Sequence, residues 1–438
     1  MKSKKETNFT MKKLRIIAAF AMSASLAHAA DFFFHDGDRV VFLGDSITEQ
    51  KLYTTYIEAY ALTRHPDWKL TFRNTGWGGD TAWLRQRAHP DETKLFAAKG
   101  DEQKTMIEKS VGAGLARDVL PLKPTAVTID FGMNDHAYQA FRPDIFAAYA
   151  ASQAELANVL KKNGARVALL TPQPIEESPQ KNDPNEKVKN DSLRKFSDGL
   201  RDVAATNGAL FVDQFDPYME LMVKARAASP QQHIGGGDAI HPGPAGHTLM
   251  AWAILKGLGA TPLVSSAEIK CGFWNRARNE QNCKVSNVKL TDGNLSFDRL
   301  DNALPMPVDP RAEAALKLAP IFDDLDVCSL KVTGLKGEDF ALSIDGKVVG
   351  AVTRSQLEAG WNIAGVKGPI FEQAQEVLQL VFKKNEVYFN RWRNVQLNGK
   401  RDAELPALDQ QIAELEGKID AARKPKTHHF ELLKPVAK

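Results

Sequence analysis

The feature that most constrains the fold is a regular alternation, between residues 38 and 258, of short apolar runs with longer segments of helical periodicity. Such alternation is typical of parallel strands joined by crossover helices. The predicted strands are 39–43, 69–73, 126–131, 166–171 and 209–212, and the predicted helices are 53–64, 145–162, 191–207 and 244–258. Five such strands predict an α/β fold with a flavodoxin-like, doubly wound parallel sheet. Its ligand site is expected beyond the carboxyl ends of the strands.

The pattern changes after about residue 262. Alternating strand-like runs separated by Asp-Gly turns predict a small antiparallel β module, with strands at 285–290, 295–300, 329–333, 340–344 and 347–352. Helical spacing then runs from Phe371 to Trp392, and a second helix begins at Pro406 with an apolar seam from Leu408 to Ala422. We expect a helical hairpin that packs on itself or on the body of the protein, and a homodimer through these helices is the alternative.

These patterns divide the chain into four parts. We expect a signal peptide over residues 1–29, an α/β domain over 30–262, a β-rich accessory region over 263–365, and a helical hairpin with a tail over 366–438. The tail contains His428 and His429, which we expect to be a solvated pair.

The N-terminal segment has the order of features found in secretory signals. Basic residues precede an apolar run at 16–26, and Ala27-His28-Ala29 fits an A-x-A cleavage site. The run is too short for a mature membrane anchor. We therefore expect an exported protein, periplasmic or secreted.

The overall charge gives no indication of a nucleic-acid partner. The chain has 57 lysines and arginines against 54 aspartates and glutamates. Several of the basic residues lie in the expected signal, so the mature chain would be close to neutral or slightly acidic.

Three cysteines are too few for a fold built on disulfides, even in an oxidising compartment. Cys271 and Cys283 are close enough in sequence to close a short loop, which would leave Cys328 free. Sequence alone does not give the distance on which such a pairing depends.

Ser46 lies where the first predicted strand ends and the next helix begins, in the run Gly44-Asp45-Ser46. Two interpretations are open. Residues 46–49 read S-x-x-E, so Ser46 could simply cap the helix. As a nucleophile, Ser46 would need a base to take its proton and a third group to orient that base.

Candidates for these partners stand near the end of the α/β unit. Asp238 precedes His241 by three residues, a spacing at which a short loop can bring the carboxylate to one imidazole nitrogen. A glycine-rich turn, residues 76–79, follows the second strand, and Asn134 follows the third. Backbone N–H groups of such a turn and an amide side chain can act as donors to a developing oxyanion.

Together these blocks, in this chain order, resemble the SGNH (GDSL) hydrolase family, over about residues 38–258. The resemblance implies a serine esterase with Ser46 as nucleophile, His241 as base and Asp238 as its orienting group. It also implies an oxyanion hole formed by the backbone N–H of Ser46, the backbone N–H of Gly79 and the side chain of Asn134. No metal or other cofactor is expected.

The substrate is less constrained than the chemistry. Expected export, the accessory β module and aromatic residues near the motifs favour O-acetyl esters of carbohydrates. The residues expected to contact the substrate are Tyr53, Trp77, Asp135 and Tyr138, with Trp83 a further aromatic candidate. A short-chain carboxylesterase or lipase-like enzyme acting on lipid esters is one alternative. A non-catalytic scaffold or binding protein is the other.

Overall fold

The computed structural model describes residues 31–177 and 185–434, and the predicted signal segment lies outside them. From Phe32 onward the chain packs as one compact unit. Within the described ranges, no helix combines the length and the apolar character needed to cross a bilayer.

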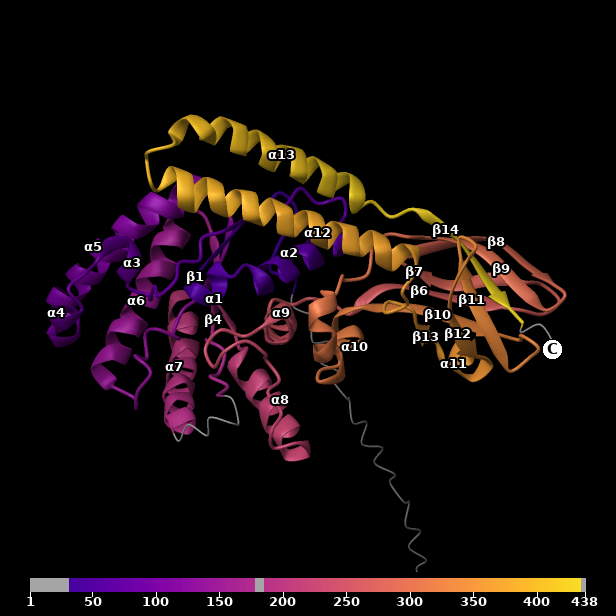
Figure 1. Cartoon of the computed structure of the whole chain (residues 1–438), viewed down its shortest axis with the longest axis horizontal. Coiled ribbons are helices and arrows are strands. Elements are labelled where there is room, and N and C mark those ends of the chain that lie inside the picture. The colour runs from indigo at the N-terminus through magenta and orange to yellow at the C-terminus, as the bar shows by residue number, and fades with distance from the viewer. Residues whose placement is uncertain (1–30, 178–184, 435–438) are drawn as a thin grey trace, which may run out of the picture. The chain divides into compact units, whose positions relative to one another are not determined.

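A parallel five-stranded sheet forms the centre of the N-terminal half (Figure 1). Its strands are β1 (Arg39–Gly44), β2 (Thr71–Asn74), β3 (Ala126–Asp130), β4 (Arg166–Leu170) and β5 (Leu210–Val212), in the order β2-β1-β3-β4-β5. All neighbouring pairs are parallel. The predicted fold class is thus confirmed, and each strand begins and ends within two residues of its prediction.

Both faces of the sheet are covered by helices, which explains why its strands are continuous apolar runs. On β1, Val40 and Phe42 face the core shared with α2 (Leu52–Arg64), α8 (Phe215–Ala228) and α9 (Pro244–Gly257). Val41 and Leu43 face the other core, shared with α5 (Gly100–Asp118), α6 (Pro143–Lys162) and α7 (Asn185–Asn207). Helices α5 and α8 were not predicted.

Two further sheets make up the β-rich region. One has the order β13-β10-β6-β7 and the other β12-β11-β14-β9-β8. Their strands are β6 (Leu263–Lys270), β7 (Arg276–Gln281), β8 (Cys283–Thr291), β9 (Asn294–Asp301), β10 (Val327–Thr333), β11 (Asp339–Ile344), β12 (Lys347–Thr353), β13 (Trp361–Asn362) and β14 (Thr427–Leu433). The buried Arg299 of β9 donates hydrogen bonds to the Ser265 hydroxyl and the Ser329 carbonyl of the other sheet, so the two sheets face each other.

The prediction of a small antiparallel module is wrong for one pair of strands and did not include the tail. Strand β6 pairs in parallel with β10, because the intervening hairpin of β8 and β9 belongs to the other sheet. The tail returns as β14 between β11 and β9. The prediction of a solvated pair is therefore wrong for His428, which is buried and hydrogen-bonds Asp345, whereas His429 is exposed and hydrogen-bonds Asp298.

The possible disulfide is also absent, since Cys271, Cys283 and Cys328 are all free. The Cys283 thiol donates to the Ser266 carbonyl at 3.1 Å. Cys271 comes five residues after Ser266 in the direction of β6, so it lies about 16 Å from Ser266 at the usual rise of a strand. A disulfide needs Cα atoms less than about 7 Å apart.

The C-terminal helices form the predicted hairpin, and it packs within the chain. Helix α12 (Pro369–Phe389) lies over α2 and β2, and α13 (Leu405–Ala422) packs on α12 (Figure 1). Ile412, Leu415 and Ile419 of the seam are buried by these contacts. The centre of the apolar seam is thus covered by the chain itself.

A buried ion pair joins the hairpin to the α/β layer. Lys384 of α12 lies 2.7 Å from Glu58 of α2, with 1% and 4% of these side chains exposed. Asn385 donates to the same Glu58 carboxylate and to the Thr55 hydroxyl. Such a pair is costly to break because either partner alone would be a buried, uncompensated charge.

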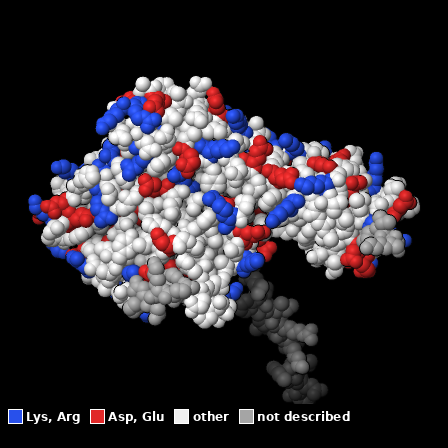
Figure 2. Space-filling view, viewed as in Figure 1, with Lys and Arg blue, Asp and Glu red and all other residues white. Residues whose placement is uncertain are grey.

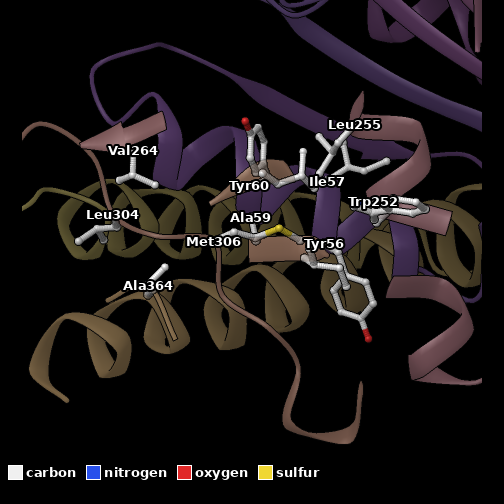
Figure 3. Packing of buried hydrophobic residues seen from close by; sticks show 14 of the residues in the cluster. Tyr56, Ile57, Ala59, Tyr60, Trp252, Leu255, Val264, Leu304, Met306 and Ala364 are labelled. Atoms are coloured by element: carbon white, nitrogen blue, oxygen red, sulfur yellow. The ribbon is translucent and has the colours of Figure 1, made fainter. Parts of the chain in front are cut away.

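The segment between β9 and β10 packs on helices α2 and α9. Leu304 and Met306 belong to the same buried cluster as Tyr56 and Tyr60 of α2 and Trp252 and Leu255 of α9, part of which is drawn in Figure 3. The backbone N–H of Leu304 donates to the Thr63 carbonyl at 3.0 Å. The β-rich region and the α/β layer thus share one hydrophobic core.

Acidic and basic side chains are interspersed over the face shown in Figure 2. No continuous basic surface is visible on that face, which agrees with the near balance of charges in the sequence.

Candidate active site

Ser46 is the first residue of α1 (Ser46–Glu49), directly beyond the carboxyl end of β1. The turn is tight: a Cβ placed on Gly44 would lie 2.1 Å from the Thr48 hydroxyl oxygen, so only glycine fits there. The helix is capped by Asp45, whose carboxylate accepts from the Ile47 N–H at 2.9 Å. The capping interpretation of Ser46 is therefore wrong, and its hydroxyl is available for another partner.

That partner is His241. The Nε2 atom of His241 lies 2.9 Å from the Ser46 Oγ, and its Nδ1 atom lies 3.1 Å from Oδ2 of Asp238. The other carboxylate oxygen, Oδ1, accepts from the backbone N–H groups of Ile240 and His241, at 2.8 and 2.7 Å. The loop thus holds the carboxylate and the imidazole in one continuous hydrogen-bonded chain with the serine.

The same hydrogen bonds keep Asp238 ionised. Partial burial opposes ionisation, but the donors from the backbone of His241 and Ile240 and from the His241 ring hold the pKa of Asp238 below its usual range. An ionised carboxylate at Nδ1 selects the imidazole tautomer with its proton on Nδ1. That tautomer leaves Nε2 free to accept the serine proton.

Two backbone N–H groups near Ser46 are unengaged. Within the residues that the structure describes, neither the Ser46 N–H nor the Gly79 N–H donates a hydrogen bond to the protein. Gly79 has φ +73°, a left-handed conformation that glycine adopts without strain. Its carbonyl accepts from the Arg85 guanidinium, which holds the peptide in place.

Asn134 is held by two contacts. Its Nδ2 donates to the Asp80 carbonyl at 2.9 Å, and its Oδ1 accepts from the Tyr138 hydroxyl at 2.8 Å. These partners set the orientation of the amide and use one of its two N–H donors. The second donor remains for a ligand.

Buried carboxylates tie together the loops that carry these donors. Asp135 accepts from the Gly132 N–H of its own loop and from the Ala82 N–H of the loop after β2. Burial raises the pKa of Asp135 to about 7. Asp80 pairs with the fully buried Arg87 at 2.8 Å, and Arg87 also pairs with Asp118 at 2.9 Å. These hydrogen bonds and ion pairs fix the loop that carries Gly79 relative to the loop that carries Asn134.

The residues expected to contact a substrate fare differently. Tyr138 is 36% exposed and lies beside Asn134. Tyr53 is fully buried, bonded to the Thr48 hydroxyl and stacked on His247, so its side chain is not available to a ligand. Asp135 is buried, and its carboxylate is already bonded to the Gly132 and Ala82 N–H groups.

The two tryptophans are also occupied within the protein. The Trp77 ring is covered by the Arg393 guanidinium, 3.5 Å from the ring centroid. Trp83 is 2% exposed and donates to Glu92. Trp77 is half-buried and Trp83 is buried, so the exposure of these side chains does not follow from their place next to the motifs in the sequence.

Three residues of the site were not predicted: Glu49, Arg85 and Arg393. The sequence indicates Glu49 only as part of a capping box, but its carboxylate accepts from the Gly78 N–H at 2.8 Å. Arg85 lies six residues after the carbonyl it binds, with no motif to mark it. Arg393 comes from the C-terminal helices, and no local pattern relates it to Glu49, 3.5 Å away.

The arrangement has the parts needed for acyl transfer. It contains a serine hydroxyl bonded to an imidazole, an ionised group that orients the imidazole, and unengaged donors next to the serine. Among the described residues no group of three or more His, Cys, Asp or Glu side chains is placed to hold a metal ion.

Comparison with known proteins gives a consistent result. The profile of the GDSL-like lipase/acylhydrolase family matches residues 42–249. The acetylxylan esterase of Geobacillus stearothermophilus is 25% identical over 231 residues, which is 51% of this chain and 94% of that protein. The structure of a gut microbial diltiazem-metabolizing enzyme is similar over 92% of this chain and 98% of its own, with a TM-score of 0.74 and 26% identity. This last similarity therefore includes the β-rich region and the hairpin.

Proposed function

Since the chain belongs to the GDSL-like lipase/acylhydrolase family and is a carboxylic ester hydrolase, we propose that it removes short acyl groups, chiefly O-acetyl groups, from hydroxylated substrates, with Ser46 as nucleophile. The observation that carries the proposal is the hydrogen-bonded chain from Ser46 through His241 to Asp238, next to two unengaged backbone N–H groups.

The reaction follows from this geometry. Ser46 Oγ attacks the ester carbonyl while His241 Nε2 takes its proton, and the carbonyl oxygen becomes an oxyanion. The N–H groups of Ser46 and Gly79 and the free amide hydrogen of Asn134 stabilise that oxyanion. The imidazolium gives its proton to the leaving alcohol, and an acyl-serine remains. Water, deprotonated by His241, then releases the carboxylic acid and restores Ser46.

A small acyl group is favoured by the residues around the nucleophile. Gly78 lies close to the nucleophile, since a Cβ placed on it would lie 3.9 Å from the Ser46 Cβ. Gly78 and the adjacent Gly79 present only peptide surface on this side of Ser46. They suit an acetyl group better than a fatty acyl group.

The alcohol side of the substrate is a carbohydrate in our proposal. The support is the similarity to an acetylxylan esterase and the expected export of the chain. A bulky drug-like ester is the second candidate, supported by the similarity to a diltiazem-metabolizing enzyme across both halves of the chain. Diltiazem itself carries one acetate ester, so both candidates share the acyl group.

The test is acid release by the purified mature chain. The substrates are acetylated xylo-oligosaccharides, diltiazem, and p-nitrophenyl esters with acyl chains of two to twelve carbons. Ser46→Ala serves as the blank. Asp101→Asn, a change on the exposed first turn of α5, serves as the matched control.

We expect serine-dependent acetate release that falls steeply beyond short acyl chains. The ratio of kcat/KM for the oligosaccharides and for diltiazem identifies the alcohol side. A preference for long acyl chains would move the protein to lipid esters. Turnover that persists in Ser46→Ala would refute the proposed nucleophile, and a lack of turnover on every ester would favour the scaffold alternative.

Export is a separate proposal. It rests on residues 1–29, whose sequence has the order of a cleavable signal. Mass spectrometry of the N-terminus after expression in a Gram-negative host tests it. We expect the mature chain to begin at Ala30 in the periplasmic or secreted fraction, and an uncleaved chain in the cytoplasm would contradict it.

A further inference from the structure

We infer that Arg393 is a positioning residue through which the C-terminal helices hold the oxyanion-binding turn. This inference rests on the proposed esterase function. It assigns a role in that reaction to a residue outside the matched family region of 42–249.

The first observation is the contact of Arg393 with two residues of the catalytic half. Its guanidinium lies over the Trp77 ring at 3.5 Å from the centroid, and its Nε lies 3.5 Å from Glu49 Oε1. Only 24% and 26% of the Arg393 and Glu49 side chains are exposed. A planar guanidinium can stack on an indole and pair with a carboxylate at the same time.

The second observation connects this pair to the site. The other Glu49 oxygen, Oε2, accepts from the Gly78 N–H at 2.8 Å. Gly78 directly precedes Gly79, whose N–H is a proposed oxyanion donor. Trp77, Gly78 and Gly79 form one turn, closed by the hydrogen bond from the Asp80 N–H to the Trp77 carbonyl at 3.0 Å. Arg393 therefore holds both the first residue of this turn and the carboxylate that binds its second residue.

The charge of Glu49 makes its partner necessary. Glu49 lies one helical turn after Ser46, and a Cβ placed on Gly78 would lie 2.8 Å from Glu49 Oε2 and 3.9 Å from the Ser46 Cβ, so the carboxylate and the nucleophile flank the same glycine. An unpaired anion there would oppose the oxyanion. The Arg393 cation offsets that charge while leaving the hydrogen bond to Gly78 in place.

The third observation is that Arg393 is itself held firmly. It belongs to the π-helical segment η3 (Asn390–Gln396), which continues α12. Trp392 of this segment is 2% exposed and contacts the Trp77 ring edge-to-face, with centroids 6.1 Å apart. Lys51, just after α1, pairs with Glu386 of α12 and lies over the Phe389 ring. π-helical segments in α-helices often occur at functional sites.

The test compares variants of two arginines in the same segment. Arg393→Met keeps most of the side-chain length and removes the charge, and Arg393→Lys keeps the charge without the planar group. Arg391→Met is the matched control, because Arg391 pairs with Asp409 of α13 and does not contact the turn. Arg393→Met/Glu49→Gln removes both charges. Each is assayed on p-nitrophenyl acetate beside wild type and Ser46→Ala.

We expect Arg393→Met to lower kcat by about 10- to 100-fold and to change KM by less than about threefold. The expected loss is smaller than the loss of about 10²- to 10³-fold that follows removal of an oxyanion donor, because the donor itself remains in place. Arg393→Lys and the double variant should each recover part of kcat. Arg391→Met should remain within about twofold of wild type.

Other outcomes overturn the inference. These are an unchanged kcat in Arg393→Met, an equal loss in Arg391→Met, or a loss confined to KM. Circular dichroism and thermal unfolding show whether Arg393→Met folds, and if it does not, Arg393→Lys is the deciding variant. A kcat of Arg393→Lys equal to that of wild type would refute the stacking role, because lysine has no planar group. Turnover that persists in Ser46→Ala would instead refute the proposed function.

Discussion

Replacement of Asp238 by asparagine is the sharpest test of how the site is built. The variant keeps Oδ1, so the bonds from the Ile240 and His241 N–H groups, at 2.8 and 2.7 Å, can persist and the loop should keep its shape. At the position of Oδ2, 3.1 Å from His241 Nδ1, an NH2 group replaces an oxygen. That group donates to Nδ1 and selects the tautomer with its proton on Nε2, which cannot accept the proton of Ser46.

The magnitude follows from two contributions. The reaction requires the tautomer with its proton on Nδ1. In the variant this tautomer lacks the hydrogen bond from Nδ1–H to a charged carboxylate, which is worth about 1.5–3 kcal/mol. The imidazolium also loses the attraction of the carboxylate, about 1 kcal/mol in water and about 4 kcal/mol at an effective dielectric of 20. Because 63% of the Asp238 side chain is exposed, the lower part of that range applies. The total of about 3–5 kcal/mol corresponds to a loss of about 10²- to 10⁴-fold in kcat/KM.

The assay is steady-state hydrolysis of p-nitrophenyl acetate at pH 8, with Asp101→Asn as control and urea unfolding as the check on folding. We expect Asp238→Asn to unfold at nearly the wild-type urea concentration while its kcat/KM falls into the stated range. A folded variant that loses less than about fivefold would refute the reasoning, because the carboxylate would then not control the tautomer.

Three further predictions concern other parts of the structure. Asn134→Ala removes one proposed oxyanion donor and should lower kcat by about 10²- to 10³-fold with little change in KM, measured on the same ester; an effect on KM alone would contradict this role. Lys384→Met leaves Glu58 buried without its partner and should lower the free energy of unfolding in urea by about 3–5 kcal/mol, with part of the loss recovered when Glu58→Gln is added. Burial raises the pKa of Asp130 to about 7 from about 3.9 in the unfolded chain, so the unfolded state ionises first and this residue destabilises the wild type increasingly from about pH 4 to pH 7. Asp130→Asn should therefore gain stability over wild type across that range, by up to about 1.4 kcal/mol per pH unit, and a difference independent of pH would refute it.

The central sheet and the residues of the hydrogen-bonded chain could be predicted because their signals are local. Each strand of a parallel sheet is buried on both faces, so it appears as an apolar run, and the residue that follows it lies at the ligand-binding edge. Ser46, Asn134 and the glycines before Asp80 all stand at such positions. Asp238 and His241 share one short loop, so three residues of spacing were enough to relate them.

The β-rich region shows where local signals end. Alternation predicted most of its strands, but alternation does not say which strands pair. The pairing of β6 with β10 joins segments about sixty residues apart, and β14 enters the second sheet from the last residues described. The burial of His428 follows from that insertion.

The sequence by itself determined the sheet and the hydrogen-bonded group of Ser46, His241 and Asp238, because backbone periodicity and short motifs are properties of neighbouring residues. Only the tertiary structure decided what covers them. Burial and charge pairing depend on which distant surfaces meet, so Tyr53 and Trp83 proved to be core residues. For the same reason Arg393, more than three hundred residues after Glu49, lies beside it at the turn of residues 77–79.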